Sequence, residues 1–168
     1  MFGLFKKKYE DQVQEEYNKL TSLTVDNDKS PIKLKKDEWY LGSMPVTMGT
    51  YKNNGNFGYG ALTARLKIAK GIYARAGAGK MGLEKSWVYD HPGELHFTTQ
   101  RIVFNGAYSN KTIPWSKVME FATDSKIDKM LIGQETGKDL AFEIKEWLAP
   151  KIMASVCAVN NGATARKK

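Results

Sequence analysis

The chain has 168 residues, of which 42% are hydrophobic and 26% are charged, and its formal net charge at pH 7 is +8. This composition is that of one globular domain and argues against wholesale disorder. No apolar run approaches the roughly 20 residues of a membrane-spanning helix, and the N-terminus lacks the pattern of a signal peptide. A single cysteine excludes an intrachain disulfide, so we expect a cytoplasmic protein.

The positive charge is unevenly distributed along the chain. Residues 31–90 contain 10 Lys and Arg against 4 Asp and Glu, whereas residues 1–30 contain 5 against 6 and residues 91–168 contain 11 against 8. Such an excess favours anionic partners, which include phospholipid headgroups, nucleic acid and acidic protein surfaces. It is equally compatible with a charge that only keeps the protein in solution.

An amphipathic helix is predicted at the N-terminus. Apolar residues recur at helical spacing from Leu4 to Leu20, and a polar linker around Ser30 separates this helix from the rest. One interpretation is a membrane or partner contact, which would place the protein at the inner membrane face. The residues of this contact are Phe2, Leu4, Phe5, Lys6, Lys7 and Lys8. We favour a helix that packs on its own domain or on a second copy, because acidic residues follow these lysines immediately.

The next segments predict short strands. Residues 39–51 have strand-like composition interrupted by glycine and proline, which indicates an edge strand or a bulged one. Residues 57–68 alternate in a way that predicts a half-buried strand with a basic outer face. Residues 72–75 and 87–89 predict two more strands, and the second is expected to end in the turn Asp90-His91-Pro92-Gly93.

A glycine-rich loop separates those last two strands. Gly77, Gly79 and Gly82 satisfy the spacing GxGxxG, but no helix is predicted after them, so a nucleotide site is not expected. The loop can instead gather amides and cations around an anion. The residues of this hypothetical anion-binding patch are Lys67, Lys70, Arg75, Lys80 and Lys85. A mobile hairpin without a ligand is the alternative, and it is at least as well supported.

The stretch from Gly93 to Thr123 has the clearest strand signals in the chain. Residues 95–98 and 101–104 alternate between apolar and polar side chains, and Asn105-Gly106 predicts a tight turn with positive backbone angles. We interpret Arg101 as a residue that satisfies turn carbonyl groups rather than as a ligand contact.

A second turn is predicted at residues 109–111, before strands at 112–115 and 118–122. A hairpin follows between residues 130 and 144. The last element is a helix over residues 146–159, with a proline in its first turns.

From Glu94 to Val118 the chain contains a small turn, Leu, an aromatic residue, Thr-Thr, Arg-Ile-x-Phe-x-Gly, a polar turn and Ile-Pro-x-x-Lys-Val. This order resembles the central strands of bacterial and phage pleckstrin-homology-like and GRAM-like domains. The resemblance implies a mainly β fold, in which about seven or more antiparallel strands form a partly open barrel capped by a C-terminal α-helix. The N-terminal amphipathic helix is an addition to that fold. The resemblance implies the following residues as the plug of the barrel: Trp147, Leu148, Ile152, Met153 and Val156.

These elements divide the chain into three parts. Residues 1–30 are predicted to be the amphipathic helix and its linker, residues 31–162 the pleckstrin-homology-like domain, and residues 163–168 a disordered basic tail.

The sequence gives no pattern typical of catalysis. Two histidines and one cysteine are too few for a zinc cluster. The triplet Glu143-Ile144-Lys145, downstream of Asp124 and Asp128, is similar to the acidic-x-Lys strand of metal-dependent nucleases, which is a remote alternative. We therefore expect no catalytic residues, no metal and no cofactor.

The expected function is that of a non-enzymatic binding module or adaptor, which recognises a protein partner or an anionic surface. In the implied architecture, an exposed strand edge and the groove beside the C-terminal helix offer main-chain pairing and an apolar pocket. Phospholipid headgroups at a membrane surface are the second alternative, and single-stranded nucleic acid is the third. An exposed N-terminal helix would additionally predict a homo-oligomer.

Overall fold

The computed structural model describes residues 2–22, 27–51, 63–69, 72–77, 87–123 and 128–160. Its helices are α1 (Phe2–Ser22), α3 (Ala149–Asn160) and the 3-10 helices η1 (Asn27–Lys29), η2 (Trp115–Lys117) and η3 (Glu146–Leu148). Its strands are β1 (Tyr40–Tyr51), β2 (Thr63–Ala69), β3 (Ile72–Gly77), β4 (Trp87–Thr98), β5 (Arg101–Gly106), β6 (Asn110–Pro114), β7 (Val118–Thr123), β8 (Lys129–Gln134) and β9 (Leu140–Glu143). The predicted tail at 163–168 lies outside the described residues.

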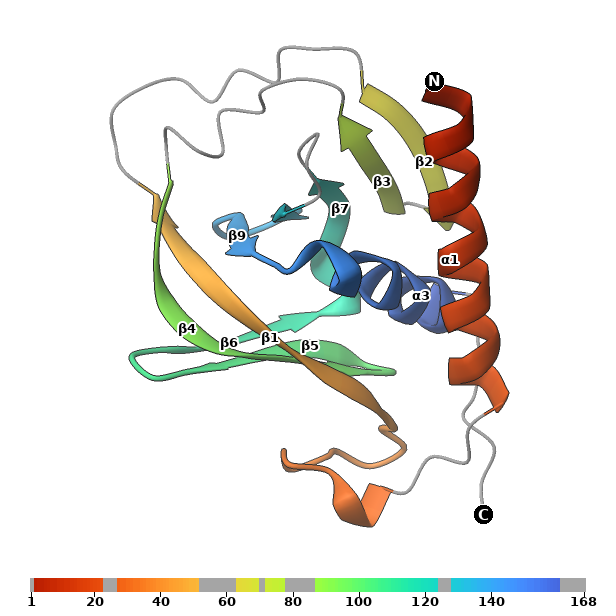
Figure 1. The fold of residues 1–168 in the computed structure, drawn as a ribbon. Helices are drawn as coiled ribbons and strands as arrows, with labels where there is room; N and C mark the ends of the chain where they lie inside the picture. Colours follow the sequence, from red (N-terminus) through yellow and green to blue (C-terminus); the bar gives the residue numbers. More distant parts are fainter. Residues whose placement is uncertain are drawn as a thin grey trace.

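The described strands form one sheet in the order β2-β3-β7-β8-β9-β1-β4-β5-β6. Seven of them, from β7 to β6 in this order, pair antiparallel with their neighbours. The hairpin of β2 and β3 joins them through a parallel pairing of β3 with β7. The sheet is not closed into a barrel, since β2 and β6 are its two edges (Figure 1). The predicted mainly β fold with flanking helices is confirmed.

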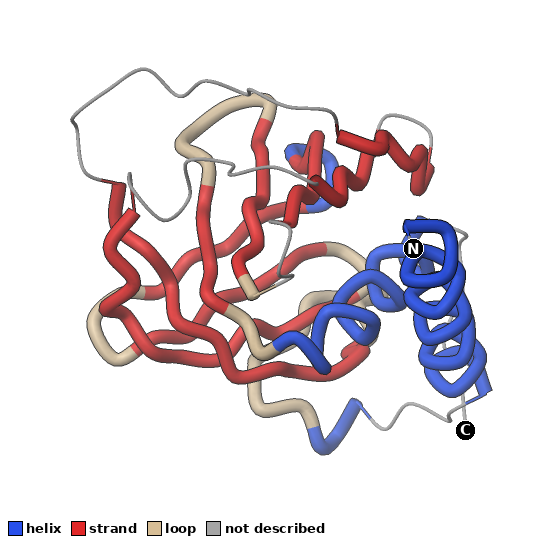
Figure 2. The backbone as a smooth tube through the Cα atoms, turned by 45° about the horizontal axis from the view of Figure 1, so that its top comes forward, coloured by secondary structure: helices blue, strands red, loops and turns tan. Residues whose placement is uncertain are grey.

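The core lies between the inner face of the curved sheet and α3 (Figure 2). Four fully buried phenylalanines come from four different strands, and they pack with apolar residues of α3. These phenylalanines are Phe97, Phe104, Phe121 and Phe142. Burying such large side chains is the main favourable contribution to folding of a domain of this size.

The C-terminal helix forms, but it begins at Ala149 rather than at Glu146, because residues 146–148 form the 3-10 helix η3. Pro150 lies in its first turn, where a missing backbone N–H costs nothing. The predicted plug residues Leu148, Ile152, Met153 and Val156 are buried. The prediction for Trp147 is wrong, because η3 turns this side chain outward and leaves it 62% exposed. Its ring lies under the Lys151 ammonium group, with Nζ 5.6 Å from the ring centroid.

The N-terminal helix α1 packs against α3, on the side away from β1 and β4 (Figure 1). Its half-buried residues recur at helical spacing; they are Tyr9, Val13, Glu16, Tyr17 and Leu20. Burial raises the pKa of Tyr9 far above its ordinary value, and the nearby Cys157 thiol adds to the rise. The apolar stripe of α1 is thus used within its own chain, as we favoured from the sequence. Neither described α-helix is both long and apolar enough to cross a lipid bilayer.

The predicted turn at residues 90–93 is wrong, since β4 continues through it as a single strand. Pro92 pairs with Thr47 of β1, and its carbonyl oxygen accepts a hydrogen bond from the Ala107 N–H on the other side. The nitrogen of Pro92 therefore faces the β5 side, where the β4–β5 pairing starts only at the next residue, Gly93. A missing N–H at the end of a ladder leaves no partner unsatisfied.

The predicted tight turn at Asn105-Gly106 is also wrong, because both residues belong to β5 and the chain turns at residues 107–109. Gly106 does not have a positive φ. It is needed for space instead: a Cβ atom there would lie 2.6 Å from the Phe104 ring. Glycine at this position permits close packing rather than an unusual backbone angle.

Candidate functional site

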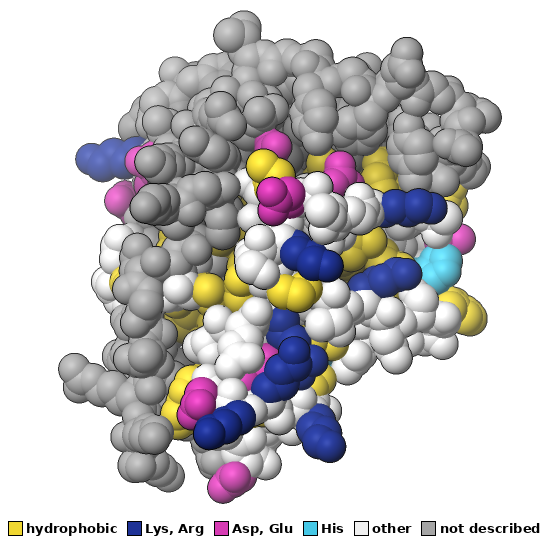
Figure 3. All heavy atoms as spheres, turned by 180° about the vertical axis from the view of Figure 1, so that it is seen from behind, with side chains coloured by type: hydrophobic (Ala, Val, Ile, Leu, Met, Phe, Trp, Pro, Cys, Tyr) yellow, Lys and Arg dark blue, Asp and Glu magenta, His cyan; other side chains and the backbone are white. Residues whose placement is uncertain are grey.

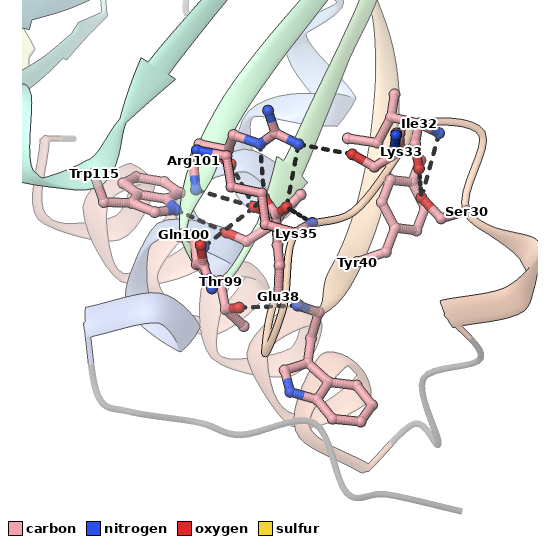
Figure 4. A network of polar contacts seen from close by, with 12 residues as sticks. Ser30, Ile32, Lys33, Lys35, Glu38, Tyr40, Thr99, Gln100, Arg101 and Trp115 are labelled. Atoms are coloured by element: carbon pink, nitrogen blue, oxygen red, sulfur yellow. Dashed lines mark hydrogen bonds and ion pairs between the residues drawn. The ribbon is translucent and has the colours of Figure 1, made fainter.

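Arg101 lies at the start of β5 and forms an ion pair with Glu38, whose side chain is fully buried. The Arg101 Nε atom lies 2.8 Å from Glu38 Oε1, and Nη2 donates to the Lys33 carbonyl oxygen at 2.8 Å (Figure 4). Arg101 is an internal donor, but the expected partners are wrong: its side chain binds the Glu38 carboxylate and the Lys33 carbonyl group rather than carbonyl groups of the turn. Sequence reasoning missed Glu38, because nothing in the local pattern connects the two positions.

Two further donors complete the surroundings of the Glu38 carboxylate. The Thr98 hydroxyl donates to Oε1 at 2.6 Å, and the Lys35 backbone N–H donates to Oε2 at 2.6 Å. Burial alone would raise the pKa of Glu38, but the hydrogen bonds from Arg101, Thr98 and Lys35 outweigh it and lower this pKa. The charged carboxylate is satisfied by its own chain and is not a ligand site.

The same network fixes the segment before β1 against the turn between β4 and β5. The Gln100 side chain donates to the Lys36 carbonyl oxygen at 3.0 Å, and the Trp115 backbone N–H donates to the Gln100 carbonyl oxygen at 3.2 Å. Exposed lysines of this segment are thereby held beside the β6–η2 connection. They are Lys33, Lys35 and Lys36, and no described acidic side chain forms an ion pair with them.

Hydrogen bonds at both ends of the β5–β6 ladder show how β6 is oriented. At one end the Trp115 N–H donates to the Gln100 carbonyl oxygen, and at the other the Gly106 N–H donates to the Ser109 carbonyl oxygen. In an antiparallel ladder, hydrogen-bonded pairs alternate with pairs that do not exchange hydrogen bonds. Every second residue of β6 therefore directs its backbone groups toward β5.

By this alternation, Lys111 and Ile113 face β5 with their backbone groups. The N–H and C=O groups of Asn110 and Thr112, and the C=O group of Pro114, point away from it. No described residue forms a backbone hydrogen bond with these outward groups. We call this side of the strand the β6 edge; it is an open row of donors and acceptors.

Positive charge and an aromatic side chain border the β6 edge. Lys111 and Lys117 are exposed, and no described carboxylate pairs with them. Tyr108 in the preceding turn is 75% exposed and contacts the His91 ring edge to face, with ring centroids 5.5 Å apart. Figure 3 shows a concentration of Lys and Arg side chains on the rear of the molecule, with hydrophobic side chains between them.

His96 is buried on the outer face of the sheet, among polar residues. Its Nδ1 lies 3.2 Å from the Tyr40 hydroxyl, and its Nε2 lies 3.4 Å from Asn105 Nδ2. Burial lowers the pKa of His96, and the neighbouring Glu94 carboxylate opposes this effect. The imidazole is used as a neutral internal hydrogen-bonding group. Ser43 pairs with His96 across the β1–β4 ladder, but its hydroxyl donates to Glu94 Oε1 at 3.1 Å.

The residues of the remote nuclease alternative are partly brought together. Lys129 Nζ lies 2.7 Å from Glu143 Oε2 and 3.9 Å from Asp128 Oδ1. A lysine that contacts both carboxylates occupies the place a magnesium ion would need. Lys145 is exposed, and Asp124 lies outside the described residues. In the described part of the chain, no three His, Cys, Asp or Glu side chains are grouped so as to hold a metal ion.

Two members of the predicted anion-binding patch lie on described strands. Lys67 of β2 pairs with Tyr73 of β3, and Arg65 pairs with Arg75. Paired and alternate positions lie on one face of a sheet, so these positions share a face. The other members, Lys70, Lys80 and Lys85, lie outside the described residues. Within the predicted N-terminal contact, Lys7 and Lys8 are exposed, and the side chains of residues 2–6 lie outside the described part of the structure.

Comparison of the sequence with protein-family models gave no match, and comparison with curated proteins gave none either. The resemblance to pleckstrin-homology-like domains therefore remains a prediction.

Proposed function

We propose that this protein is a non-enzymatic binding module that recognises a protein partner by strand addition at the β6 edge. The supporting observation is the orientation of Asn110, Thr112 and Pro114, whose outward backbone groups have no partner among the described residues. An extended segment that adds to such an edge gains main-chain hydrogen bonds without a preformed pocket.

The groove beside the C-terminal helix is a weaker choice for this partner. Helix α1 packs on α3, and β3 pairs with β7, which is the other end of the seven-stranded antiparallel part. The chain thus covers with its own segments one side of α3 and one end of the seven-stranded antiparallel part. At the other end of that part, the described strands leave the β6 edge open.

A non-catalytic role agrees with the use of the buried charged groups. Glu38 pairs with Arg101, and the largely buried Lys129 pairs with Glu143. Catalytic groups are usually held unpaired or with shifted pKa in a site that substrate can reach. Here the buried charges join segments of the fold to one another.

The experiment uses the substitution Thr112→Pro, which removes one outward N–H, and Thr112→Val, which keeps it, as its matched control. Proteins captured from the native host by the wild type and the Val variant, but not by the Pro variant, are purified and tested directly. Hydrogen exchange at Asn110 and Thr112 should slow when such a partner binds. Equal capture by all three folded proteins, or unchanged exchange at these amides, would contradict strand addition.

An anionic surface is a second candidate ligand, favoured by the shared face of Arg65, Lys67 and Arg75 on the β2–β3 hairpin. These basic positions lie on the edge strand β2 and on its neighbour β3, at the end of the sheet, where a phospholipid headgroup or a nucleic-acid phosphate can approach. The variant Lys67→Glu/Arg75→Glu should lose binding to vesicles containing phosphatidylserine. The control Lys138→Glu/Lys145→Glu has the same net charge, changes exposed lysines outside both predicted contact sets, and should retain it. A gel shift with single-stranded DNA at low salt would identify nucleic acid instead.

A further inference from the structure

We infer that the segment received by the β6 edge is extended and acidic, with an Asp or Glu side chain opposite Lys111. This inference rests on the proposed function and specifies the chemistry of the partner. It follows from two properties of β6: which of its backbone groups are open, and which side chains lie beside them.

The backbone of β6 limits the length of the added strand. Asn110 and Thr112 each offer an outward N–H and an outward C=O group, so each can exchange a pair of hydrogen bonds with a partner residue. Pro114 offers only its C=O group, because proline has no N–H. Regular pairing therefore ends at Pro114, and the partner strand is short and centred on Asn110 and Thr112.

The side chains of β6 determine what can stand opposite them. Lys111 pairs with Phe104, and Ile113 pairs with Ile102, so both lie on the face of the sheet that covers the core. Ile113 is buried, whereas Lys111 is exposed at the rim. Directly opposite side chains of paired strands are about 5 Å apart at their Cβ atoms, and opposite charges there stabilise the pairing. An acidic residue therefore suits the position opposite Lys111, and an apolar residue suits the position opposite Ile113.

The charge around the strand favours the same ligand. Lys117 follows β6, and Lys33, Lys35 and Lys36 are held beside the β6–η2 connection by the hydrogen bonds of Gln100. Asp37 is the exposed acidic residue within this lysine-rich segment. These lysines would attract acidic residues on either side of the paired strand and would repel a second copy of this chain, whose net charge is +8.

The test selects binders from a displayed library of random linear peptides, with the wild-type protein as bait and the Thr112→Pro variant for counter-selection. We expect the retained peptides to be enriched in Asp and Glu and to bind less well in high salt, because salt screens exposed charges. Retained peptides without such enrichment would overturn the acidic partner while leaving strand addition intact. A library that yields no peptide sensitive to Thr112→Pro would overturn strand addition itself.

A charge exchange then tests the position opposite Lys111. The variant Lys111→Glu should bind a selected acidic peptide about tenfold more weakly, since attraction is replaced by repulsion. Replacing the acidic residue of that peptide by lysine should restore binding to Lys111→Glu. The control Lys138→Glu changes the net charge equally, but its site lies in the turn between β8 and β9, and it should bind as the wild type does. Equal weakening by both variants would show that only net charge matters and would overturn the assigned pair.

Discussion

The Arg101 guanidinium and the Glu38 carboxylate, 63 residues apart in the chain, form an ion pair that joins the segment before β1 to the start of β5. The pair holds the lysine-rich segment in place beside the β6–η2 connection, where the candidate site lies. Its removal should therefore affect stability first and the charge around the β6 edge second.

Replacing Arg101 by methionine should destabilise the protein by about 3–5 kcal/mol, because it leaves the buried carboxylate of Glu38 without its cationic partner. Urea denaturation followed by circular dichroism measures this change. The double variant Arg101→Met/Glu38→Met should recover part of the loss, since it removes the uncompensated charge. A loss below about 1 kcal/mol for the single variant would mean that the remaining hydrogen bonds suffice for Glu38.

Acid should weaken the fold through Glu38. The pKa of this carboxyl is lowered in the folded protein, so its contribution to stability is fully present above the unfolded pKa of about 4.5. The contribution is lost as the pH falls through the lower, folded pKa. The free energy of unfolding of Glu38→Gln should therefore vary less with pH in this range than that of the wild type. Parallel pH profiles for the two proteins would contradict the assignment.

Glycine is required where β4 and β5 begin to pair. A Cβ atom at Gly93 would overlap the Asn105 carbonyl oxygen and lie 2.7 Å from the Phe104 ring. The substitution Gly93→Ala should cost about 1–3 kcal/mol, as overpacking usually does, and this should appear as a lower midpoint of thermal unfolding. Gly133→Ala is the control, since its nearest neighbour would be Glu120 Cβ at an ordinary 3.4 Å. Equal midpoints for the two variants would show that the strands can move apart without cost.

The docking of α1 on α3 can be tested with a charge in its half-buried stripe. Val13→Asp should release the helix and expose apolar surface of α3, because a carboxylate at this interface would lose hydration. Increased binding of a hydrophobic dye and self-association in light scattering should follow. Gln14→Asp, one position away on the exposed side, should cause neither change. A monomer without dye binding after Val13→Asp would show that the helix contributes little to covering α3.

The sequence was sufficient for most of the secondary structure, because periodicity is a local property. The N-terminal helix, the hairpin of β8 and β9 and the C-terminal helix were expected from residue spacing, and they form at these places. The errors at Pro92 and Gly106 have one cause. Proline and glycine indicate a turn when considered locally, but here neighbouring strands decide their roles: Pro92 faces the end of a ladder, and Gly106 makes room for a ring.

The sequence alone did not identify the β6 edge as the candidate site. Composition indicated a basic protein with many short strands, and it directed attention to the glycine-rich hairpin and the N-terminal lysines. Three relationships are visible only in the tertiary structure: β3 pairs with β7, α1 packs on α3, and β6 is left as an open edge of the sheet. Which strand ends a sheet depends on pairings between distant segments, and the energies of those pairings come from packing and burial that no local pattern encodes.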